Sequence, residues 1–340
     1  MSAKAIRTQI LGVGSYVPPK IVKNDDLAKL MDTSDEWITQ RSGIRQRHWV
    51  EGSTSSSDLA YEACLKALAS AKVKKEEIDL LLLCTLSPDH EFPGTACFLQ
   101  HKLNMPGIPA IDVRQQCTGF IYALSIADQF IRTGMYKKAL IVGTEVHSKG
   151  LDISTRGRDV AVLFGDGAGA AVVGATEVGA PEQDRYIYST HIHADGSFAK
   201  ELWAPGPGTA YVGPRVPKDM IESGDCFPKM NGKTVYVNAV RRMPEAVMEA
   251  LDANGKKVSD IDLFIFHQAN LRINEMVAKQ LGIPEEKVFN TIDRFANTTS
   301  ATIPIGLSEA VKAGKLKPGM TVAMAAFGSG FTWGSALLRW

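Results

Sequence analysis

The sequence predicts an α/β protein made of two duplicated α/β halves. Three observations predict this class: short apolar segments alternate with amphipathic helical segments, two stretches of the chain recur later in the same order, and the composition is that of a globular protein. The 340 residues, of which 45% are hydrophobic and 22% charged, suffice for one large domain or two fused ones. Such alternation is typical of helices that pack on largely buried sheets.

The first repeat joins two segments that each read as an amphipathic helix, a polar turn and a buried strand. EACLKALASAKVKKEEIDLLLL, from Glu62, lies over EAVMEALDANGKKVSDIDLFIF, from Glu245. At a constant offset, Glu62, Ala63, Ala67, Leu68, Lys74, Ile78, Asp79 and Leu80 meet identical residues. Pro244 stands just before the second copy and predicts a break or kink near the start of its helix.

The second repeat follows at a slightly shorter offset. IDVRQQCTGF, from Ile111, lies over TIDRFANTTS, from Thr291, and places Cys117 opposite Asn297. The helices that follow both segments end in matching glycines, Gly134 and Gly314. Two matches in the same order indicate duplicated halves of roughly 170 residues.

The periodicity predicts the main elements of each half. Strands are expected at 80–84, 110–113, 139–143, 263–266 and 321–326. Helices are expected at 57–71, 118–133, 271–281 and 300–313. We therefore expect an N-terminal half over 1–180 and a C-terminal half over 181–340.

The segment 181–231 differs from the rest of the chain. It carries APGPG, GPRVP and Cys226, and it has few periodic apolar residues. It reads as a long connecting excursion. Two interpretations stay open: a lid or part of a substrate mouth, or a surface loop with no part in catalysis.

The charge balance excludes some classes of partner. A net charge of +1 gives no global field that would attract nucleic acid or a membrane surface. The first residues lack the apolar run of a signal peptide, and no stretch reaches the roughly 18–20 apolar residues of a membrane span. We therefore expect a cytoplasmic protein whose five cysteines are free thiols. His191 and His193 could suggest a metal, but they lack a convincing third ligand, so no metal site is expected.

Three polar residues stand where predicted strands end. Cys117 follows strand 110–113 and opens a helix, Asn297 occupies the matching place in the other half, and His267 follows strand 263–266. Ligands gather at the carboxyl ends of strands in such sheets, so a pseudo-twofold axis would bring the three together. Each residue alone has a simpler interpretation: a structural cysteine, a scaffold histidine, or an asparagine that caps a helix.

The chemistry of the three side chains suits acyl transfer. A helix N-terminus favours negative charge and can lower a cysteine pKa from about 8.5 to about 3.5–7.5. A thiolate attacks a thioester and forms an acyl-enzyme. A neutral histidine and an asparagine can then donate hydrogen bonds to an enolate oxygen.

Eight segments carry a resemblance to a known family. They are TSDEWITQRSGIRQRH, DVRQQCTGF, Arg156–Gly157, FGDGAGAA, STHIHADGS, HQANLRI, RFANTTSATIP and AFGSGFTWGSA. Together they resemble the thiolase-fold ketosynthases, specifically the beta-ketoacyl-acyl-carrier-protein synthase III family. The resemblance implies a five-layered αβαβα arrangement, a homodimer and no cofactor. It also implies decarboxylative Claisen condensation of an acyl-CoA with malonyl-acyl carrier protein.

The resemblance implies a role for each residue of the trio. Cys117 would be the acylated nucleophile, while His267 and Asn297 would bind the malonyl thioester carbonyl and stabilise its enolate. The backbone N–H groups of Cys117 and Ser329 would form the other oxyanion hole.

The resemblance also implies a route for coenzyme A. Trp37 and Arg156 resemble residues that sandwich its adenine. Arg41 and Gly157 would lie along the same entrance, and Asn270 would lie on the pantetheine path.

Two further residues resemble contacts with other protein chains. Arg272 resembles a contact for the acidic carrier protein. Phe92 resembles a residue that reaches into the acyl pocket of the partner subunit.

The chain departs from the family pattern in several places. Gln115 and Gln116 replace small residues before the nucleophile, Ser329 interrupts a run that is commonly all glycine, and Val237 stands where a lysine is common. Two alternatives therefore stay open: a secondary-metabolite ketosynthase of the same family with a longer or unusual acyl substrate, and a non-catalytic acyl-binding subunit.

Overall fold

Two sheets form the framework of the computed structural model, which describes residues 6–178, 185–212 and 214–340. The first sheet has the order β1 (Ile6–Tyr16), β7 (Gly167–Glu177), β6 (Lys138–Glu145), β4 (Leu80–Cys84), β5 (Ala110–Val113). The second has the order β11 (Leu263–Phe266), β12 (Thr321–Gly328), β13 (Thr332–Arg339), β8 (Ile187–Ala194). Both sheets are mixed, with parallel strands on one side and antiparallel strands on the other.

The two sheets repeat one pattern of strand pairing. In the first, β4 runs parallel to β6, and β7 and β1 follow antiparallel. In the second, β11 runs parallel to β12, and β13 and β8 follow antiparallel. Even β5 has a counterpart, because Val288 makes a parallel bridge to Phe264 beside β11. The predicted duplication is therefore visible in the topology.

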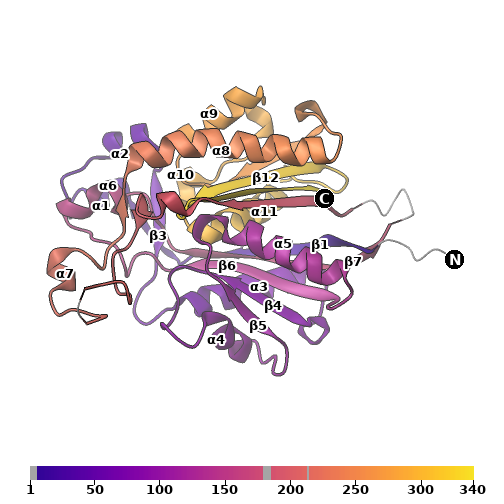
Figure 1. Ribbon diagram of the computed structural model, residues 1–340, viewed down its shortest axis with the longest axis horizontal. Helices are drawn as coiled ribbons and strands as arrows, with labels where there is room; N and C mark the ends of the chain where they lie inside the picture. Colours follow the sequence, from indigo (N-terminus) through magenta and orange to yellow (C-terminus); the bar gives the residue numbers. More distant parts are fainter. Residues whose placement is uncertain (1–5, 179–184, 213) are drawn as a thin grey trace.

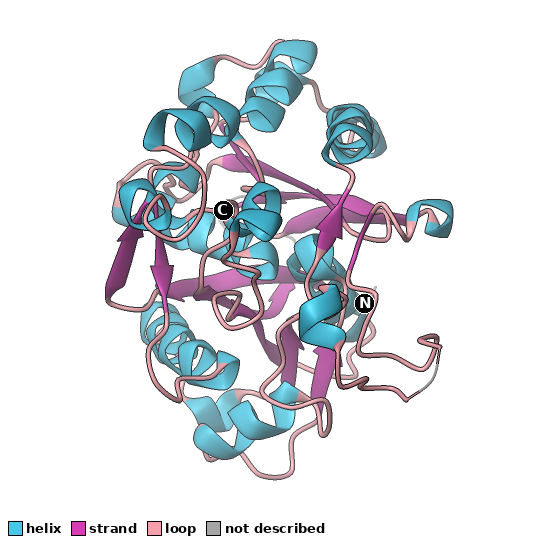
Figure 2. Cartoon of the chain, turned by 90° about the vertical axis from the view of Figure 1, so that its left-hand side faces the viewer, coloured by secondary structure: helices cyan, strands magenta, loops and turns pink. Residues whose placement is uncertain are grey.

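Helices and sheets alternate in five layers (Figures 1 and 2). Outside the first sheet lie α3 (Ser56–Ala71) and α4 (Thr95–Lys102), and outside the second lie α8 (Gly232–Ala253) and α9 (Leu271–Leu281). Between the sheets lie α5 (Gly119–Arg132) and α11 (Thr302–Lys312), whose apolar side chains join one core with both sheets. The chain therefore has the predicted αβαβα arrangement.

Local chemistry explains why matched segments fold alike. The matched outer helices α3 and α8 each lead into a residue with left-handed backbone, Lys72 (φ 54°) after α3 and Gly255 (φ 59°) after α8. At the start of the strands that follow, Asp79 accepts the N–H of Lys138 (2.9 Å) and Asp262 accepts that of Thr321 (2.8 Å). These two aspartates belong to the identical positions of the repeat.

Shorter elements cover the carboxyl ends of the strands. They are β2 (Lys20–Lys23), α1 (Asn24–Leu27), α2 (Asp35–Ser42), β3 (Gln46–Trp49), α6 (Arg158–Ala161), β9 (Leu202–Trp203), α7 (Met220–Ser223), β10 (Lys229–Met230) and α10 (Ile292–Phe295). The fully buried Arg47 joins some of them, since its guanidinium donates to Asn24 Oδ1 and to the Val162 carbonyl, both at 2.7 Å.

Several predictions need correction. Strands β1, β7 and β13 were not among the expected strands, and β8 lies inside the segment 181–231, which was expected to be an irregular excursion. The half-buried side chains of β8 lack a clear alternation, which hides this strand in the sequence. The break expected near Pro244 is absent: α8 continues from Gly232 to Ala253, held against β12 and β13.

The boundary between the halves stays a prediction. The expected division at 180 falls between β7 and β8, among residues outside the described ranges. Within the described residues, no helix is both long and apolar enough to span a bilayer.

Candidate active site

Cys117 and Asn297 occupy equivalent turns of the two halves. The short 3-10 helix Gln116–Thr118 carries Cys117 into α5, and Asn297 lies just before the corresponding 3-10 helix Thr299–Ala301. The preceding residues, Gln116 (φ 40°) and Ala296 (φ 56°), both have left-handed backbone. Non-glycine residues rarely adopt that conformation, and where they do, it is often at functional sites.

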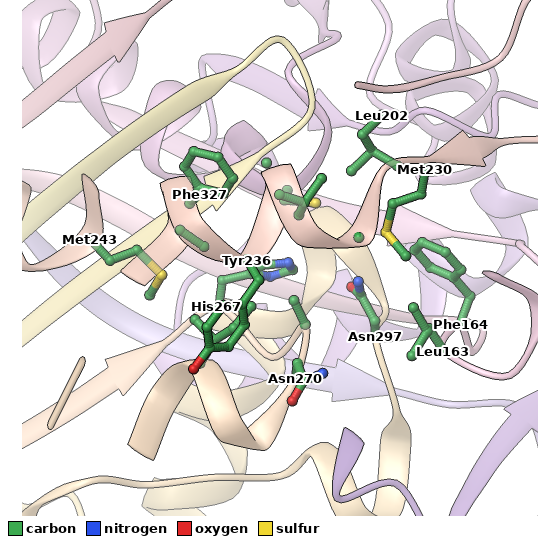
Figure 3. A pocket seen from close by; sticks show the side chains of 17 residues that line it. Leu163, Phe164, Leu202, Met230, Tyr236, Met243, His267, Asn270, Asn297 and Phe327 are labelled. Carbon is green, nitrogen blue, oxygen red and sulfur yellow. The ribbon is translucent and has the colours of Figure 1, made fainter. Parts of the chain in front are cut away.

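The fold brings the predicted trio to one cavity. Cys117, His267 and Asn297 all line it, and they are buried, with 8%, 2% and 5% of their surfaces exposed. Figure 3 shows His267 and Asn297 at this cavity, with Asn270 beside them. The other walls are mostly apolar and come from Leu163, Phe164, Leu202, Met230, Gly232, Val235, Tyr236, Ala239, Met243, Ala269, Ile273, Phe327 and Gly328.

His267 is held at one ring nitrogen and free at the other. Its Nδ1 lies 2.7 Å from Thr302 Oγ1, while its buried Nε2 has no hydrogen-bond partner. Burial lowers the pKa of His267 to about 3, so the imidazole is neutral. The unpaired Nε2 is available to a ligand in the cavity.

Asn297 is also fixed at one end. Its Oδ1 accepts the Thr299 N–H at 2.8 Å, which leaves the amide nitrogen as the free end. Its backbone N–H donates to the Leu163 carbonyl at 2.9 Å, and its carbonyl accepts the Gly165 N–H at 3.1 Å. Backbone hydrogen bonds from the first half of the chain therefore fix the turn that carries Asn297.

Cys117 is a neutral thiol in the resting protein. Burial raises its pKa to about 12, with a further contribution from Glu145, while hydrogen bonds from the backbone N–H groups of Ser329 and Cys117 oppose the rise. The helix N-terminus does not dominate, contrary to the low pKa considered from the sequence. The same two N–H groups that interact with the thiol are those expected in the oxyanion hole.

Gly328 gives Cys117 its space. A Cβ atom on Gly328 would lie 2.5 Å from Cys117 Cβ and 2.9 Å from its sulfur. Gly328 ends β12 beside Ser329, whose hydroxyl donates to the Leu202 carbonyl. Serine at 329 therefore keeps its backbone N–H free for the thiol.

A second cavity also reaches Cys117. It shares Phe164 and Leu202 with the first cavity but not His267 or Asn297. Its remaining walls are Leu86, Arg114, Gln116, His147, Trp203, Ala204, Pro228, Thr299 and Ser329. The nucleophile thus stands between two spaces.

Segment 181–231 contributes to both spaces. Leu202 and Met230 line the first cavity, and Trp203, Ala204 and Pro228 line the second. Part of this segment is therefore cavity wall, and its residues 181–184 and 213 lie outside the described ranges.

The expected coenzyme contacts are only partly brought together. Arg41 lies over the ring of Trp37 at 4.3 Å, and the second guanidinium over that ring, at 4.9 Å, belongs to Arg158. Arg156 instead binds Asp152 at 2.5 Å and donates to the Glu222 carbonyl at 2.7 Å. Arg158 was not among the predicted contacts, although it follows Arg156–Gly157 directly.

The other entrance residues lie where the chain turns. Gly157 is packed against Asp152, whose carbonyl oxygen would lie 2.0 Å from an added Cβ. Asn270 caps α9, accepts the Arg272 N–H at 2.9 Å and donates to the Arg41 carbonyl at 2.9 Å. Asn270 therefore joins the first cavity to the helix that carries Arg41.

Residues expected to meet other chains lie on the surface. The exposed Arg272 lines a hollow with Tyr236, Glu275, Met276 and Lys279. Phe92 is 80% exposed, and Val237 is 54% exposed on α8.

His191 and His193 have a protein partner. Both contact the Glu249 carboxylate, at 3.3 and 2.6 Å. Among the described residues, no group of three or more His, Cys, Asp or Glu side chains is arranged to hold a metal ion.

Four residues near the trio were given no role from the sequence: Glu145, His147, Thr299 and Thr302. They contact the trio or its loop only through the fold. The available signals were the segment RFANTTSATIP, which contains Thr299 and Thr302, and the predicted strand 139–143, which Glu145 and His147 follow.

Comparisons with known proteins bear on the family of the chain. The family model for 3-oxoacyl-[acyl-carrier-protein] synthase III matches residues 111–196, and that for its C-terminal part matches 251–340. The beta-ketoacyl-[acyl-carrier-protein] synthase III of Xanthomonas campestris is 47% identical over 99% of this chain and 100% of its own length. That of Paramagnetospirillum magneticum is 46% identical over 98% of this chain and 99% of its own.

Solved structures show the same relationship. The 3-oxoacyl-[acyl-carrier-protein] synthase III of Aquifex aeolicus matches with a TM-score of 0.88 and 41% identity, covering 98% of this chain and 100% of its own. The priming beta-ketosynthase of the R1128 polyketide pathway matches with a TM-score of 0.88 and 31% identity, covering 100% of this chain and 98% of its own. The chain therefore belongs to the beta-ketoacyl-acyl-carrier-protein synthase III family of thiolase-fold acyltransferases.

Proposed function

We propose that this protein condenses an acyl-CoA with malonyl-acyl carrier protein through an acyl thioester on Cys117, releasing CO2 and a beta-ketoacyl carrier protein. One observation carries the proposal: Cys117 borders two cavities, and only one of them contains His267 and Asn297. An acyl chain on the sulfur can occupy one space while the malonyl unit meets the two donors in the other. The reaction belongs to fatty acid or related biosynthesis.

The first half-reaction transfers the acyl group to the enzyme. The sulfur of Cys117 attacks the thioester carbonyl, and the N–H groups of Cys117 and Ser329 bind the oxyanion that forms. The carbon–sulfur bond of the substrate breaks, and the thiol proton leaves with coenzyme A. Since the resting thiol is neutral, proton loss accompanies attack.

The second half-reaction makes the carbon–carbon bond. The malonyl carboxylate leaves as CO2, and its electron pair becomes an enolate whose oxygen accepts hydrogen bonds from His267 Nε2–H and the Asn297 amide. The enolate carbon attacks the Cys117 thioester, and the cysteine leaves as a thiolate that takes a proton from solvent. For Nε2 to donate, Nδ1 must accept the hydroxyl of Thr302, which lies at 2.7 Å.

Both substrates would enter along one path. Trp37, Arg41, Arg156 and Gly157 would contact the nucleotide of coenzyme A, and Asn270 would contact its pantetheine arm. The exposed, positively charged side chain of Arg272 would attract the acidic carrier protein.

We further propose a cytoplasmic homodimer that uses no cofactor. The dimer surface would include the exposed Phe92 and the edge strand β5 of the first sheet. The protein groups named above supply the hydrogen bonds that the two half-reactions require, and solvent supplies the proton that Cys117 takes up. Light scattering after gel filtration would test the dimer.

The decisive test is the variant Cys117→Ala. With acyl-CoA and malonyl carrier protein, it should form no acyl-enzyme by intact mass and no condensation product. Cys97→Ala, which removes an exposed thiol, is the matched control and should retain both activities. Full condensation by Cys117→Ala would refute the proposal, and stoichiometric labelling of the wild type without turnover would favour a non-catalytic acyl-binding subunit.

A second candidate is a family member with an unusual acyl substrate, as in secondary metabolism. It is favoured by the polar side chains of Arg114, Gln116 and His147, which line the second cavity. A pocket for a plain aliphatic chain would instead have apolar walls. An intact-mass screen of acyl-CoAs tests it: preference for acyl groups with oxygen functions supports this candidate, and preference for plain aliphatic chains opposes it.

A further inference from the structure

One loop, residues 297–302, anchors both proposed enolate donors. It holds Asn297 Oδ1 through the Thr299 N–H at 2.8 Å and His267 Nδ1 through Thr302 Oγ1 at 2.7 Å. Thr302 Oγ1 also lies 3.0 Å from the Thr299 carbonyl. The position of this loop therefore sets the direction of both free donor ends.

The loop is held in a conformation that is unfavourable by itself. Thr299 has a φ of 48°, in the left-handed region, which is a genuine outlier for a β-branched residue. Such a backbone persists only where surrounding contacts impose it. The contacts come from the other half of the chain, at the carboxyl end of β6.

Glu145, the last residue of β6, makes the first contact. Its fully buried carboxylate accepts the Ser300 hydroxyl at 2.8 Å and lies 3.4 Å from the Ser300 backbone nitrogen. The same carboxylate accepts the Leu86 N–H at 3.1 Å and the Ser87 hydroxyl at 2.6 Å. Glu145 thus ties the loop of the second half to the turn after β4 in the first.

His147 makes the second contact. Its Nε2 lies 2.6 Å from Thr299 Oγ1, and its ring packs against Phe164 with the centroids 4.6 Å apart. Burial lowers the pKa of His147 to about 3, so the ring is neutral beside the threonine hydroxyl. The side chain of His147 therefore contacts Thr299 directly, at the residue with the left-handed backbone.

The chemistry of Glu145 suits a fixed role. A carboxylate accepts several hydrogen bonds at once, and removing one partner of a buried charged network leaves an unsatisfied group. Neither oxygen of Glu145 lines either cavity, so the residue acts through the loop and not on substrate.

We propose that Glu145, assisted by His147, is a positioning residue for condensation: from the first half it holds loop 297–302 of the second half and so aims His267 and Asn297 at the enolate. The inference rests on the proposed function, because it concerns the donors of that reaction.

The test separates the two half-reactions in Glu145→Gln and Ser300→Ala. Acylation of Cys117 is followed by intact mass with the acyl-CoA that labels the wild type fastest, and CO2 release from malonyl carrier protein is followed on the acyl-enzyme. Both variants should slow CO2 release by at least about 10-fold, since misplacement of catalytic groups by about 1 Å can cost 100-fold. Acylation should stay within threefold for Ser300→Ala.

For Glu145→Gln we expect the rates of the two half-reactions to change in different directions. Ionised Glu145 raises the pKa of Cys117, and burial raises the pKa of Glu145 itself to about 7. Above pH 7, Glu145→Gln should therefore leave acylation unchanged or faster while CO2 release falls. A merely structural loss would slow both half-reactions together. Non-additive effects in the double variant would show that the two residues act through one contact.

Ser335→Ala is the matched control. Ser335 is as buried as Ser300, and its hydroxyl donates to a backbone carbonyl, that of Ala246, outside both cavities. It should leave the ratio of the two half-reactions unchanged. Equal slowing of both half-reactions, or no change in CO2 release, in Ser300→Ala overturns the inference, whereas the proposed function fails only if Cys117→Ala remains active.

Discussion

Gly328→Ala tests whether the backbone around Cys117 is as closely packed as the structure indicates. The added Cβ would lie 2.5 Å from Cys117 Cβ and 2.9 Å from its sulfur, where ordinary contacts begin at 3.4 Å. The backbone at Gly328 or at Cys117 must therefore move by about 1 Å, in a core packed as densely as an organic crystal. Because the N–H of Ser329 follows Gly328 directly, the movement also displaces a proposed oxyanion donor.

The magnitude follows from these distances. A displacement of about 1 Å at reacting groups can lower the rate by about 100-fold. Overpacking of this kind typically lowers the free energy of unfolding by about 1–3 kcal/mol. We therefore expect Gly328→Ala to fold, with reduced stability, and to acylate Cys117 at roughly 1% of the wild-type rate.

Stopped reactions analysed by intact mass measure the acylation rate, and urea denaturation measures the stability. The control is Gly196→Ala, because a Cβ at Gly196 meets nothing within 4 Å and its backbone is not left-handed. The control should match the wild type in both measurements. Acylation by Gly328→Ala within threefold of the wild type, at unchanged stability, would contradict the packing argument.

Three further predictions follow from the site. His267→Ala should retain acylation of Cys117 and lose about 100–1,000-fold in condensation, measured by product formation, and equal loss in both steps would contradict its role as an enolate donor. Iodoacetamide at pH 7–8 should label the exposed Cys97 before the buried Cys117, whose pKa burial raises to about 12; peptide mass spectrometry measures the order, and the reverse order would show an activated thiolate. Stability should rise with pH between about 4.5 and 6.5, because burial lowers the pKa values of His147 and His267 from 6.5 to about 3, whereas burial raises that of Glu145 from 4.5 to about 7 and opposes them. From these three groups, the unfolded state binds a net of one more proton than the native state, so the free energy of unfolding should rise by about 1.4 kcal/mol per pH unit. Urea denaturation measures this free energy, and no rise across that pH range would contradict the prediction.

The sequence by itself determined the two-part architecture and the identity of the three central polar residues. Periodicity located β4, β5, β11 and α9 with their observed bounds, because these elements are short, strongly apolar or amphipathic, and bounded by polar turns. The repeat placed Cys117 opposite Asn297, since a duplicated chain puts equivalent turns on opposite sides of one axis.

Other features were beyond the reach of one sequence. The edge strand β8 was hidden because its side chains are only half buried, and α8 passed through Pro244 because packing on the sheet outweighs the local preference. The contact of Arg158 with Trp37 likewise depends on the fold, because the two residues are far apart in the sequence.

The tertiary structure alone decided the electrostatics of the site. A helix N-terminus favours a low cysteine pKa, but burial near Glu145 makes Cys117 neutral, because desolvation of a thiolate exceeds the effect of two backbone N–H groups. Desolvation depends on every atom that packs around the sulfur. It is therefore a property of the assembled halves, which the order of residues along the chain does not reveal.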